Sequence, residues 1–265
     1  MKNKKIKSPT TTSKPKGKSK SSFLRKCWVF IRNFLIIFFV VSIAWVVLAR
    51  FLPIYLTPLM PIRSIEALFR GETPKNNKTW VPMEDISPNM VQAVVASEDN
   101  LFLKHNGFSF FAISKAFEHN LKGKRIRGGS TISQQTAKNV FLWQQRSYLR
   151  KGLEAYFTVL IELIWNKERI MEVYLNVIEM GDGIYGVEAA SQEFFDKPAI
   201  EISKSQAALI AACLPNPRKF LVDHPSGFVE RRKAKILQRM GQIGPVNFHK
   251  KELAKKKKHK RKHQE

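Results

Sequence analysis

Cysteine and acidic residues are scarce in this chain. Its 265 residues include two cysteines, Cys27 and Cys213, and 21 Asp and Glu against 46 Lys and Arg. No CxxC or HExxH pattern occurs, so the sequence predicts no metal site built by the protein, and any metal would have to arrive with a substrate. The two cysteines stand on opposite sides of a long apolar segment, and we therefore expect no disulfide between them.

The excess of basic residues is concentrated at the two ends of the chain. Residues 1–26 carry ten Lys and Arg and no acid, and residues 249–265 carry nine against two acids. The span 51–248 is closer to balance, with 25 basic and 19 acidic residues. The C-terminal stretch KKKKHKRK is typical of a solvated segment, and contact with anionic lipid or polymer is the alternative. Nucleic-acid binding is the weakest explanation, and we expect no nucleic-acid partner.

Long apolar runs are also few, and the one that stands out lies near the N-terminus. Sixteen residues from Phe34 to Ala49 carry no charge, and Trp28 to Ile31 extend the run past Arg32. At about 1.5 Å per residue, a helix from Trp28 to Leu48 would cross the ~30 Å hydrocarbon core, with Arg32 reaching back toward water. Ten positive charges before the run and Arg50 after it predict a cytoplasmic N-terminus. No small-x-small cleavage site follows, which favours an uncleaved anchor over a signal peptide.

Prolines interrupt the segment that follows the apolar run, and the chain divides into five expected parts. These are a basic cytoplasmic tail (1–27), a transmembrane helix (28–49), a juxtamembrane connector (50–79), a folded domain (80–245) and a basic C-terminal tail (246–265). An apolar content of 44% is enough for one sizeable core. Alternating strand patterns are lacking, so we expect a mainly helical domain with at most a short hairpin.

The first predicted helix of the domain carries an acidic residue, Glu98, near its end. Ser87 followed by Pro88 is a strong helix start, and the apolar residues of the helix recur with helical spacing. The side chain of Glu98 points the same way as this apolar stripe. Burial there would raise the pKa of Glu98 and suit it to general acid or base catalysis. The alternative, equally weighted from this helix alone, is a carboxylate satisfied by backbone groups or a cation.

A glycine-rich loop precedes a second helix of interest: Gly128, Gly129 and Ser130. Thr131 followed three residues later by Gln134 predicts a capping box at the helix start. Thr131, Gln135 and Lys138 then recur at i, i+4 and i+7, which places a hydroxyl, an amide and an ammonium group on one face. Such a face near a helix N-terminus suits a phosphate group, and an exposed polar face is the alternative.

A third helix is predicted over residues 148–165, with Arg150 and Glu154 one turn apart. The two residues could form a structural salt bridge. However, Arg before Glu is the less favourable order for helix stability, so a catalytic role is at least as good an explanation.

Two further helices are predicted from their terminal residues. Asn166 is expected to cap a helix that Gly181 ends, and Ser203 with Gln206 is expected to open one that Pro215 stops.

Four stretches resemble, in this order and spacing, the signature motifs of the peptidoglycan glycosyltransferases of glycosyltransferase family 51: EDNLFLKHNGF, RGGSTISQQTAKN, RKGLE and NKERIMEVYLN. The resemblance covers about residues 80–215. It implies a mainly α, lysozyme-like glycosyltransferase domain with a smaller membrane-associated jaw lobe. It also implies a substrate, lipid II, polymerised into β-1,4-linked glycan strands with release of undecaprenyl diphosphate at the outer side of the bacterial plasma (inner) membrane.

The resemblance also implies roles for individual residues. Glu98 matches the catalytic glutamate, expected to deprotonate the acceptor sugar's 4-hydroxyl in an inverting reaction, and Glu154 matches the second acid, expected to position the diphosphate or a cation bound to it. Lys138 and Arg150 match cations that neutralise the leaving diphosphate. The full set of expected substrate-binding residues is Asp99, Phe102, His105, Gly129, Ser130, Thr131, Gln134, Gln135, Lys138, Asn139 and Arg150. For His105 a structural role is an equally good explanation.

An apolar and then basic stretch lies between the first two motifs: Phe108, Phe110, Phe111, Ile113 and Phe117, followed by Lys122, Lys124, Arg125 and Arg127. In the family this region corresponds to the jaw, which dips into the membrane. We therefore expect the aromatic cluster to contact lipid, and the alternative is an ordinary core helix with a basic loop.

The larger relatives in the family carry a transpeptidase domain with SxxK and KTG motifs. Here the only SxxK match is Ser13 to Lys16 in the basic tail, no KTG exists, and the chain is too short for such a domain. We therefore expect no transpeptidase activity. The expected partners are lipid II, the nascent glycan strand, membrane lipid, and separate transpeptidases or other cell-wall synthesis proteins.

Two other functions are compatible with parts of the sequence. A lysozyme-like enzyme could use Glu98 to cleave glycan, but it would not need the pair of cations Lys138 and Arg150, which the loss of a diphosphate does need. A non-catalytic membrane scaffold of cell-wall synthesis is less favoured still, because both glutamates are present.

Overall fold

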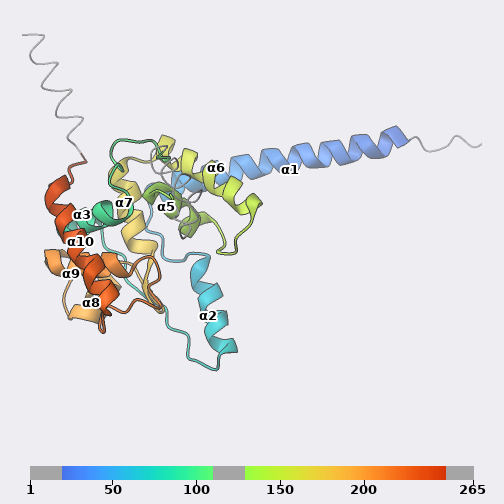
Figure 1. Cartoon of the computed structure of the whole chain (residues 1–265). Coiled ribbons are helices and arrows are strands. Elements are labelled where there is room, and N and C mark those ends of the chain that lie inside the picture. The colour runs from blue at the N-terminus through green and yellow to red at the C-terminus, as the bar shows by residue number, and fades with distance from the viewer. Residues whose placement is uncertain (1–19, 110–128, 249–265) are drawn as a thin grey trace, which may run out of the picture. The chain divides into compact units, whose positions relative to one another are not determined.

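The computed structural model describes residues 20–109 and 129–248, and these residues are mainly helical (Figure 1). The chain divides into an N-terminal unit that ends at Trp45 and a second unit that begins at Val46. The residues expected to form the jaw, from Phe110 to Arg127, lie outside the described part, as do Gly128 and the basic tail beyond Phe248. Phe108, the first of the expected aromatic cluster, is half-buried.

The N-terminal unit consists of most of helix α1, Lys20–Ala49, which contains no acidic residue. The helix is long and apolar enough to cross a membrane over Phe23–Ala49. Large apolar side chains such as Phe34, Ile37 and Trp45 are exposed along it. An apolar helix without a protein covering is compatible with a single-pass membrane anchor.

The second unit contains the remaining elements. Its α-helices are α2 Leu59–Phe69, α3 Pro88–Glu98, α5 Ile132–Phe141, α6 Tyr148–Ile164, α7 Lys167–Val177, α8 Val187–Phe195, α9 Lys204–Cys213 and α10 Gly227–Ile243. Two 3-10 helices are η1 Met83–Asp85 and η2 Ala199–Glu201. The strands β1 Asn77–Lys78, β2 Glu179–Gly181 and β3 Ile184–Tyr185 form a small sheet in the order β1-β3-β2. The mainly α fold expected from the sequence is thus confirmed.

The helix starts follow the capping residues of the sequence. Ser87 accepts a hydrogen bond from the backbone of α3, and Asn166 accepts one from the backbone of α7. Thr131 and Ser203 each form a complete capping box, at α5 and α9. These side chains satisfy backbone N–H groups that have no partner inside the helix, so the predicted starts are confirmed.

One predicted helix end is wrong. Gly181 does not end α7, because the helix stops at Val177 and Ile178 already adopts an extended backbone. The chain then enters β2, which pairs antiparallel with β3, so Gly181 lies in a strand opposite Ile184. The short hairpin that the sequence analysis expected, without a position, is formed by β2 and β3.

The expected connector over residues 50–79 contains ordered structure. Pro58 precedes α2, and Pro61 lies in its first turn, where the missing N–H of proline costs no helical hydrogen bond. Further along, Asn77 of β1 pairs in parallel with Ile184 of β3. The boundary near residue 80 stays a prediction.

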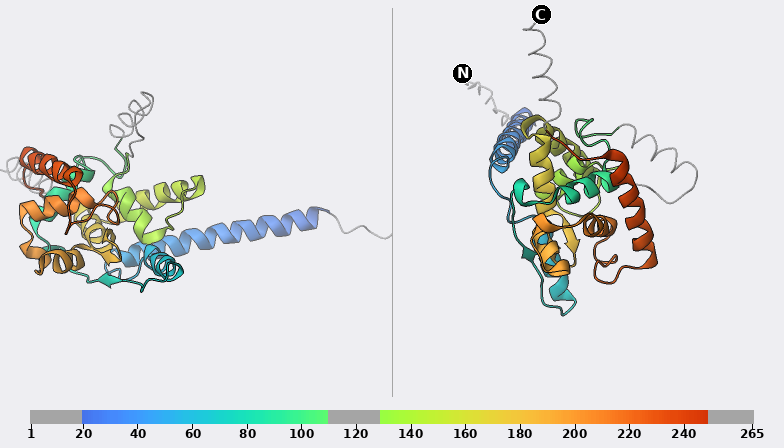
Figure 2. Two further views of the ribbon diagram at one scale, coloured as in Figure 1. Left: turned by 60° about the horizontal axis from the view of Figure 1, so that its bottom comes forward. Right: turned by 90° about the vertical axis from the view of Figure 1, so that its left-hand side faces the viewer.

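Two groups of helices surround the core. Helices α3, α9 and α10 pack against one another, and α5 packs against α6 and α7 (Figure 2). The amide of Gln92 in α3 donates to the carbonyls of Met240 and Gly244 at the end of α10, both over 2.7 Å. These buried hydrogen bonds fix α10 beside α3.

Asn176 of α7 makes the corresponding link to the segment before α3. The residue is fully buried, its Oδ1 accepts from the Val81 N–H over 2.9 Å, and its Nδ2 donates to the carbonyls of Val81 and Glu172. The Asn176 side chain thereby supplies hydrogen-bond partners for the N–H and the carbonyl of Val81.

Asn176→Ala should lower the free energy of unfolding by about 1 to 3 kcal/mol, because it removes the hydrogen-bond partner of the half-buried N–H and C=O groups of Val81. Urea unfolding of the detergent-solubilised protein would measure the effect. The matched control is Asn216→Ala at an exposed site, expected to stay within about 0.5 kcal/mol of wild type. Equal effects of the two changes would contradict this account of Asn176.

Candidate active site

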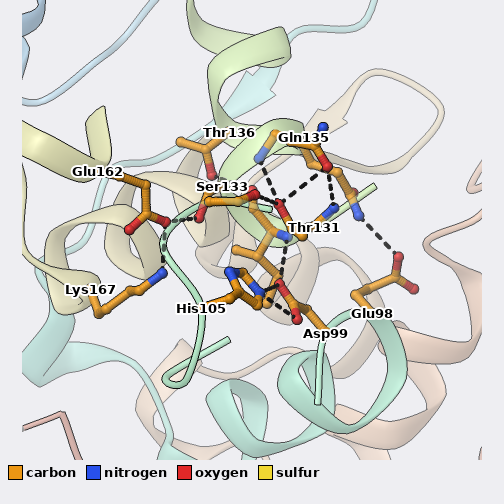
Figure 3. A network of polar contacts seen from close by, with 12 residues as sticks. Glu98, Asp99, His105, Thr131, Ser133, Gln135, Thr136, Glu162 and Lys167 are labelled. Atoms are coloured by element: carbon orange, nitrogen blue, oxygen red, sulfur yellow. Dashed lines mark hydrogen bonds and ion pairs between the residues drawn. The ribbon is translucent and has the colours of Figure 1, made fainter. Parts of the chain in front are cut away.

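Glu98 is the last residue of α3, and its carboxylate lies beside α5 (Figure 3). One oxygen accepts a hydrogen bond from Gln135 Nε2 over 3.2 Å, and the other lies 3.4 Å from Nη2 of Arg232 on α10. The side chain is 16% exposed. Burial raises the pKa of Glu98, while the contacts with Gln135 and Arg232 act in the opposite direction. A partly exposed carboxyl with a raised pKa is suited to accept a proton near neutral pH.

Tyr174 of α7 fixes the orientation of the Gln135 amide. Its hydroxyl donates to Gln135 Oε1 over 3.3 Å, and the ring is fully buried. Burial and the neighbouring acids Glu98 and Asp99 raise the pKa of Tyr174 well above its ordinary value, so the phenol keeps its proton. Because the amide oxygen is occupied by Tyr174, the amide nitrogen of Gln135 faces Glu98.

Asp99 connects the end of α3 to the start of α5. Its carboxylate accepts a hydrogen bond from the Ile132 N–H over 3.1 Å, and both of its oxygens lie 2.9 Å from Nε2 of His105. Asp99 is buried, and a carboxylate is favoured at the N-terminus of a helix. The first motif therefore holds Glu98 in place through its neighbour.

Thr131 is buried and forms a hydrogen bond with the loop that ends the first motif. Its hydroxyl donates to the Gly107 carbonyl over 2.6 Å and accepts from the Gln134 N–H over 3.2 Å. Gly107 has a φ of +86°, and a Cβ there would stand 2.8 Å from Cγ2 of Thr158, so only glycine fits. Before the helix, Gly129 is half-buried and Ser130 is exposed.

The expected open face of hydroxyl, amide and ammonium groups is therefore formed only in part. Thr131 and Gln134 are buried in the capping box, whereas Gln135 and Lys138 are half-buried. Asn139 supports the same helix, because its Nδ2 donates to the Gln135 carbonyl and its Oδ1 accepts from Gln144. The substrate contacts expected of these residues stay predictions.

A group of cations lies at the junction of α5 and α6. Arg150 Nη1 donates to Glu154 Oε2 over 2.7 Å, and Lys151 contacts the other oxygen of the same buried carboxylate. Within the described residues no hydrogen bond or ion pair reaches the ammonium group of Lys138. Burial lowers the pKa of Lys138, and Arg150 lowers it further while Glu154 opposes the change. A half-buried ammonium group beside other cations favours an anionic ligand.

Phe102 packs in the core next to a chain of polar contacts that reaches α5. Phe102 is fully buried, with Lys167 Nζ 4.6 Å from its ring centroid. Lys167 pairs with Glu162 over 2.6 Å, and Glu162 accepts from Ser133 of α5 over 2.5 Å (Figure 3). Phe102 thus packs in the core, and its expected part in substrate binding stays a prediction.

The sequence interpretation missed Arg232 and Tyr174. Arg232 lies three residues after Val229 and four before Ile236, both buried, so it stands on the apolar face of α10. A charge on an apolar helix face is the same signal that identified Glu98. It could have identified Arg232 as well.

Comparisons of the sequence with known proteins identify its relatives. The family model described as Transglycosylase matches residues 65–241, a wider span than the motif-bearing stretch. A biosynthetic peptidoglycan transglycosylase of Bdellovibrio bacteriovorus is 53% identical over 226 residues, which are 84% of this chain and 90% of that protein. Proteins of the same name from Bacteroides thetaiotaomicron and Caulobacter vibrioides are 54% and 51% identical, over 83% and 80% of this chain and 89% and 92% of theirs.

The raised pKa of Glu98 predicts that its charge destabilises the fold. Because the folded-state pKa lies above the unfolded-state value, ionisation costs folding free energy at neutral pH. Glu98→Gln should therefore raise the free energy of unfolding at neutral pH. The gain should vanish as the pH falls through the folded-state pKa toward the unfolded-state value.

Thermal unfolding across a pH series would test this, with Glu201→Gln at an exposed site as the control. A Glu98→Gln protein that is less stable than wild type at neutral pH would show that the carboxylate is structural.

Proposed function

Because the chain belongs to the peptidoglycan transglycosylase family, we propose that it uses lipid II as its substrate and extends glycan strands with release of undecaprenyl diphosphate. The family makes the protein an enzyme of peptidoglycan synthesis. The observation that supports the finer assignment best is the half-buried Glu98, held between Gln135 and Arg232. This carboxylate has both the restraint and the raised pKa that a general base requires.

In the proposed reaction, Glu98 takes the proton of the acceptor sugar's 4-hydroxyl. The freed oxygen forms a bond to the anomeric carbon of the lipid-linked donor, and the bond from that carbon to the diphosphate oxygen breaks. Attack from the face opposite the leaving group inverts the anomeric centre and gives a β-1,4 linkage. Gln135 and Arg232 orient the carboxylate, and the proton stays on Glu98 until it is passed to solvent.

The cations at the junction of α5 and α6 suit the leaving diphosphate. Lys138 and Arg150 would neutralise its developing charge, and Glu154 holds Arg150 in place through their buried ion pair. No group of three His, Cys, Asp or Glu side chains in the described part of the chain could hold a metal ion. In this proposal any divalent cation arrives with the substrate diphosphate.

Helix α1 suits a substrate that is itself held in a membrane. The basic residues that precede it favour a cytoplasmic N-terminus, which would place the catalytic unit at the outer surface of the plasma membrane. Lipid II and the nascent strand would be bound there, beside separate transpeptidases.

Glu98→Gln should reduce polymer formation from labelled lipid II by about 10²- to 10⁴-fold, the usual contribution of a general base. Full-length protein in detergent would be assayed, the products separated by size, and the polymer digested with muramidase. The control is Glu201→Gln, expected to polymerise normally. If the wild-type protein shortened preformed glycan and left lipid II intact, the function would be glycan hydrolysis and not polymerisation. If it did neither, a non-catalytic scaffold would be favoured.

Arg232→Gln should move the acid limb of the pH–rate profile to higher pH. The positive charge of Arg232 lowers the pKa of Glu98, so its removal raises that pKa, and a general base must be deprotonated to act. Activity should therefore fall most at acid pH and recover at alkaline pH.

The adjacent and exposed Arg231→Gln is the matched control, expected to leave the profile unchanged. An equal loss of activity at every pH in the Arg232 variant would show that this residue acts only on folding or on substrate affinity.

A further inference from the structure

Helix α2 exposes an apolar stripe in its second half. Ile65, Leu68 and Phe69 are spaced so that they lie on one side of the helix, and 53%, 63% and 88% of their surfaces are exposed. A helix on the surface of a water-soluble domain normally buries such a face.

The side of α2 that contacts the domain includes charged residues. Arg63 Nη2 lies 3.3 Å from Glu179 Oε2 of β2, and Glu66 Oε2 lies 3.7 Å from Nη1 of Arg218. A polar cavity of about 240 Å³, lined in part by Arg63, Arg70 and Asp182, lies on this side.

Leu59, Met60 and Ala67 of α2 are also buried, the first two in a cluster with Tyr185. The helix therefore contacts the domain through both apolar side chains and ion pairs, and Ile65, Leu68 and Phe69 form a second apolar stripe that the domain leaves exposed.

The segment before α2 exposes apolar side chains as well. Phe51, Leu52, Tyr55 and Leu56 are between 55% and 70% exposed. Only residues 50–58 separate the end of α1 from α2, and a chain of this length spans at most roughly 30 Å. If α1 crosses a membrane, α2 is therefore tethered close to its surface.

We propose that the apolar face of α2, formed by Ile65, Leu68 and Phe69, inserts into the boundary between headgroups and acyl chains of the same membrane. An amphipathic helix gains free energy there by burying its apolar side chains while its polar side stays hydrated or paired. The Arg63–Glu179 ion pair would transmit this contact to the domain, because it joins α2 to the hairpin of β2 and β3. This second lipid contact is separate from glycan polymerisation and from the anchor itself.

The test places a fluorescent label on this face in the full-length protein. Leu68→Cys would be made in a Cys27→Ser background, in which the remaining Cys213 is fully buried, and the background protein alone would measure stray labelling. The labelled protein would be reconstituted into vesicles of phosphatidylcholine and phosphatidylglycerol, with or without lipids that carry a nitroxide on the acyl chain. Ile200→Cys in η2, 45% exposed, is the matched control.

We expect a blue shift and a loss of emission with nitroxide lipid for the label at residue 68, and neither change at residue 200. The proposal would be overturned if a water-soluble quencher, and not the nitroxide lipid, reduced the emission of the label at residue 68. It would also be overturned if the nitroxide lipid reduced emission equally at residues 68 and 200. A label protected from both lipid and water would show that a protein, such as a second copy of this chain, covers the face instead of lipid. None of these readouts needs turnover, so a failure of the proposed polymerisation would leave this result unaffected.

Discussion

The position of Glu98 depends on the buried carboxylate of Asp99. Asp99 accepts from the first N–H group of α5 and pairs with His105, which fixes the end of α3 against the start of α5. Glu98 is the adjacent residue, so the same link sets where its side chain emerges. Gln135 then meets Glu98 from one turn further along α5. Without this junction, the hydrogen bond between α3 and α5 that orients Glu98 would have no fixed geometry.

Helix α5 joins two electrostatic regions of opposite sign. Gln135 contacts the acid Glu98, and Lys138, three residues later, lies near the cations around Glu154. Burial moves the pKa of Glu98 up and that of Lys138 down, so both groups are brought closer to neutrality by the same physical cause. Such burial costs stability, and buried hydrogen bonds such as those of Asn176 offset it. Acid and amine stay within reach of a ligand because neither is fully covered.

Local chemistry allowed much of the fold to be predicted from the sequence. Capping residues act on N–H groups two or three positions away, so helix starts such as those at Thr131 and Asn166 could be inferred correctly. The pairing of Glu98 with Arg232 joins residues 134 positions apart, and helical spacing shows only that each lies on an apolar face. The end of α7 was missed because strand pairing with β3, a tertiary interaction, stops the helix before its glycine.

The orientation of α2 shows why a periodic pattern alone does not tell which face is inside. The pattern indicates two faces, and burial in water would place Ile65, Leu68 and Phe69 against the core. Instead, α2 contacts the domain through the buried Leu59 and Met60 and through the ion pair of Arg63 with Glu179, a residue 116 positions away. In a chain held at a bilayer, lipid offers a second apolar environment, so one side of the helix can pack on the protein while the exposed apolar stripe is buried in the membrane. The exposed apolar stripe of α2 is therefore consistent with the same physical rule once two apolar phases are counted.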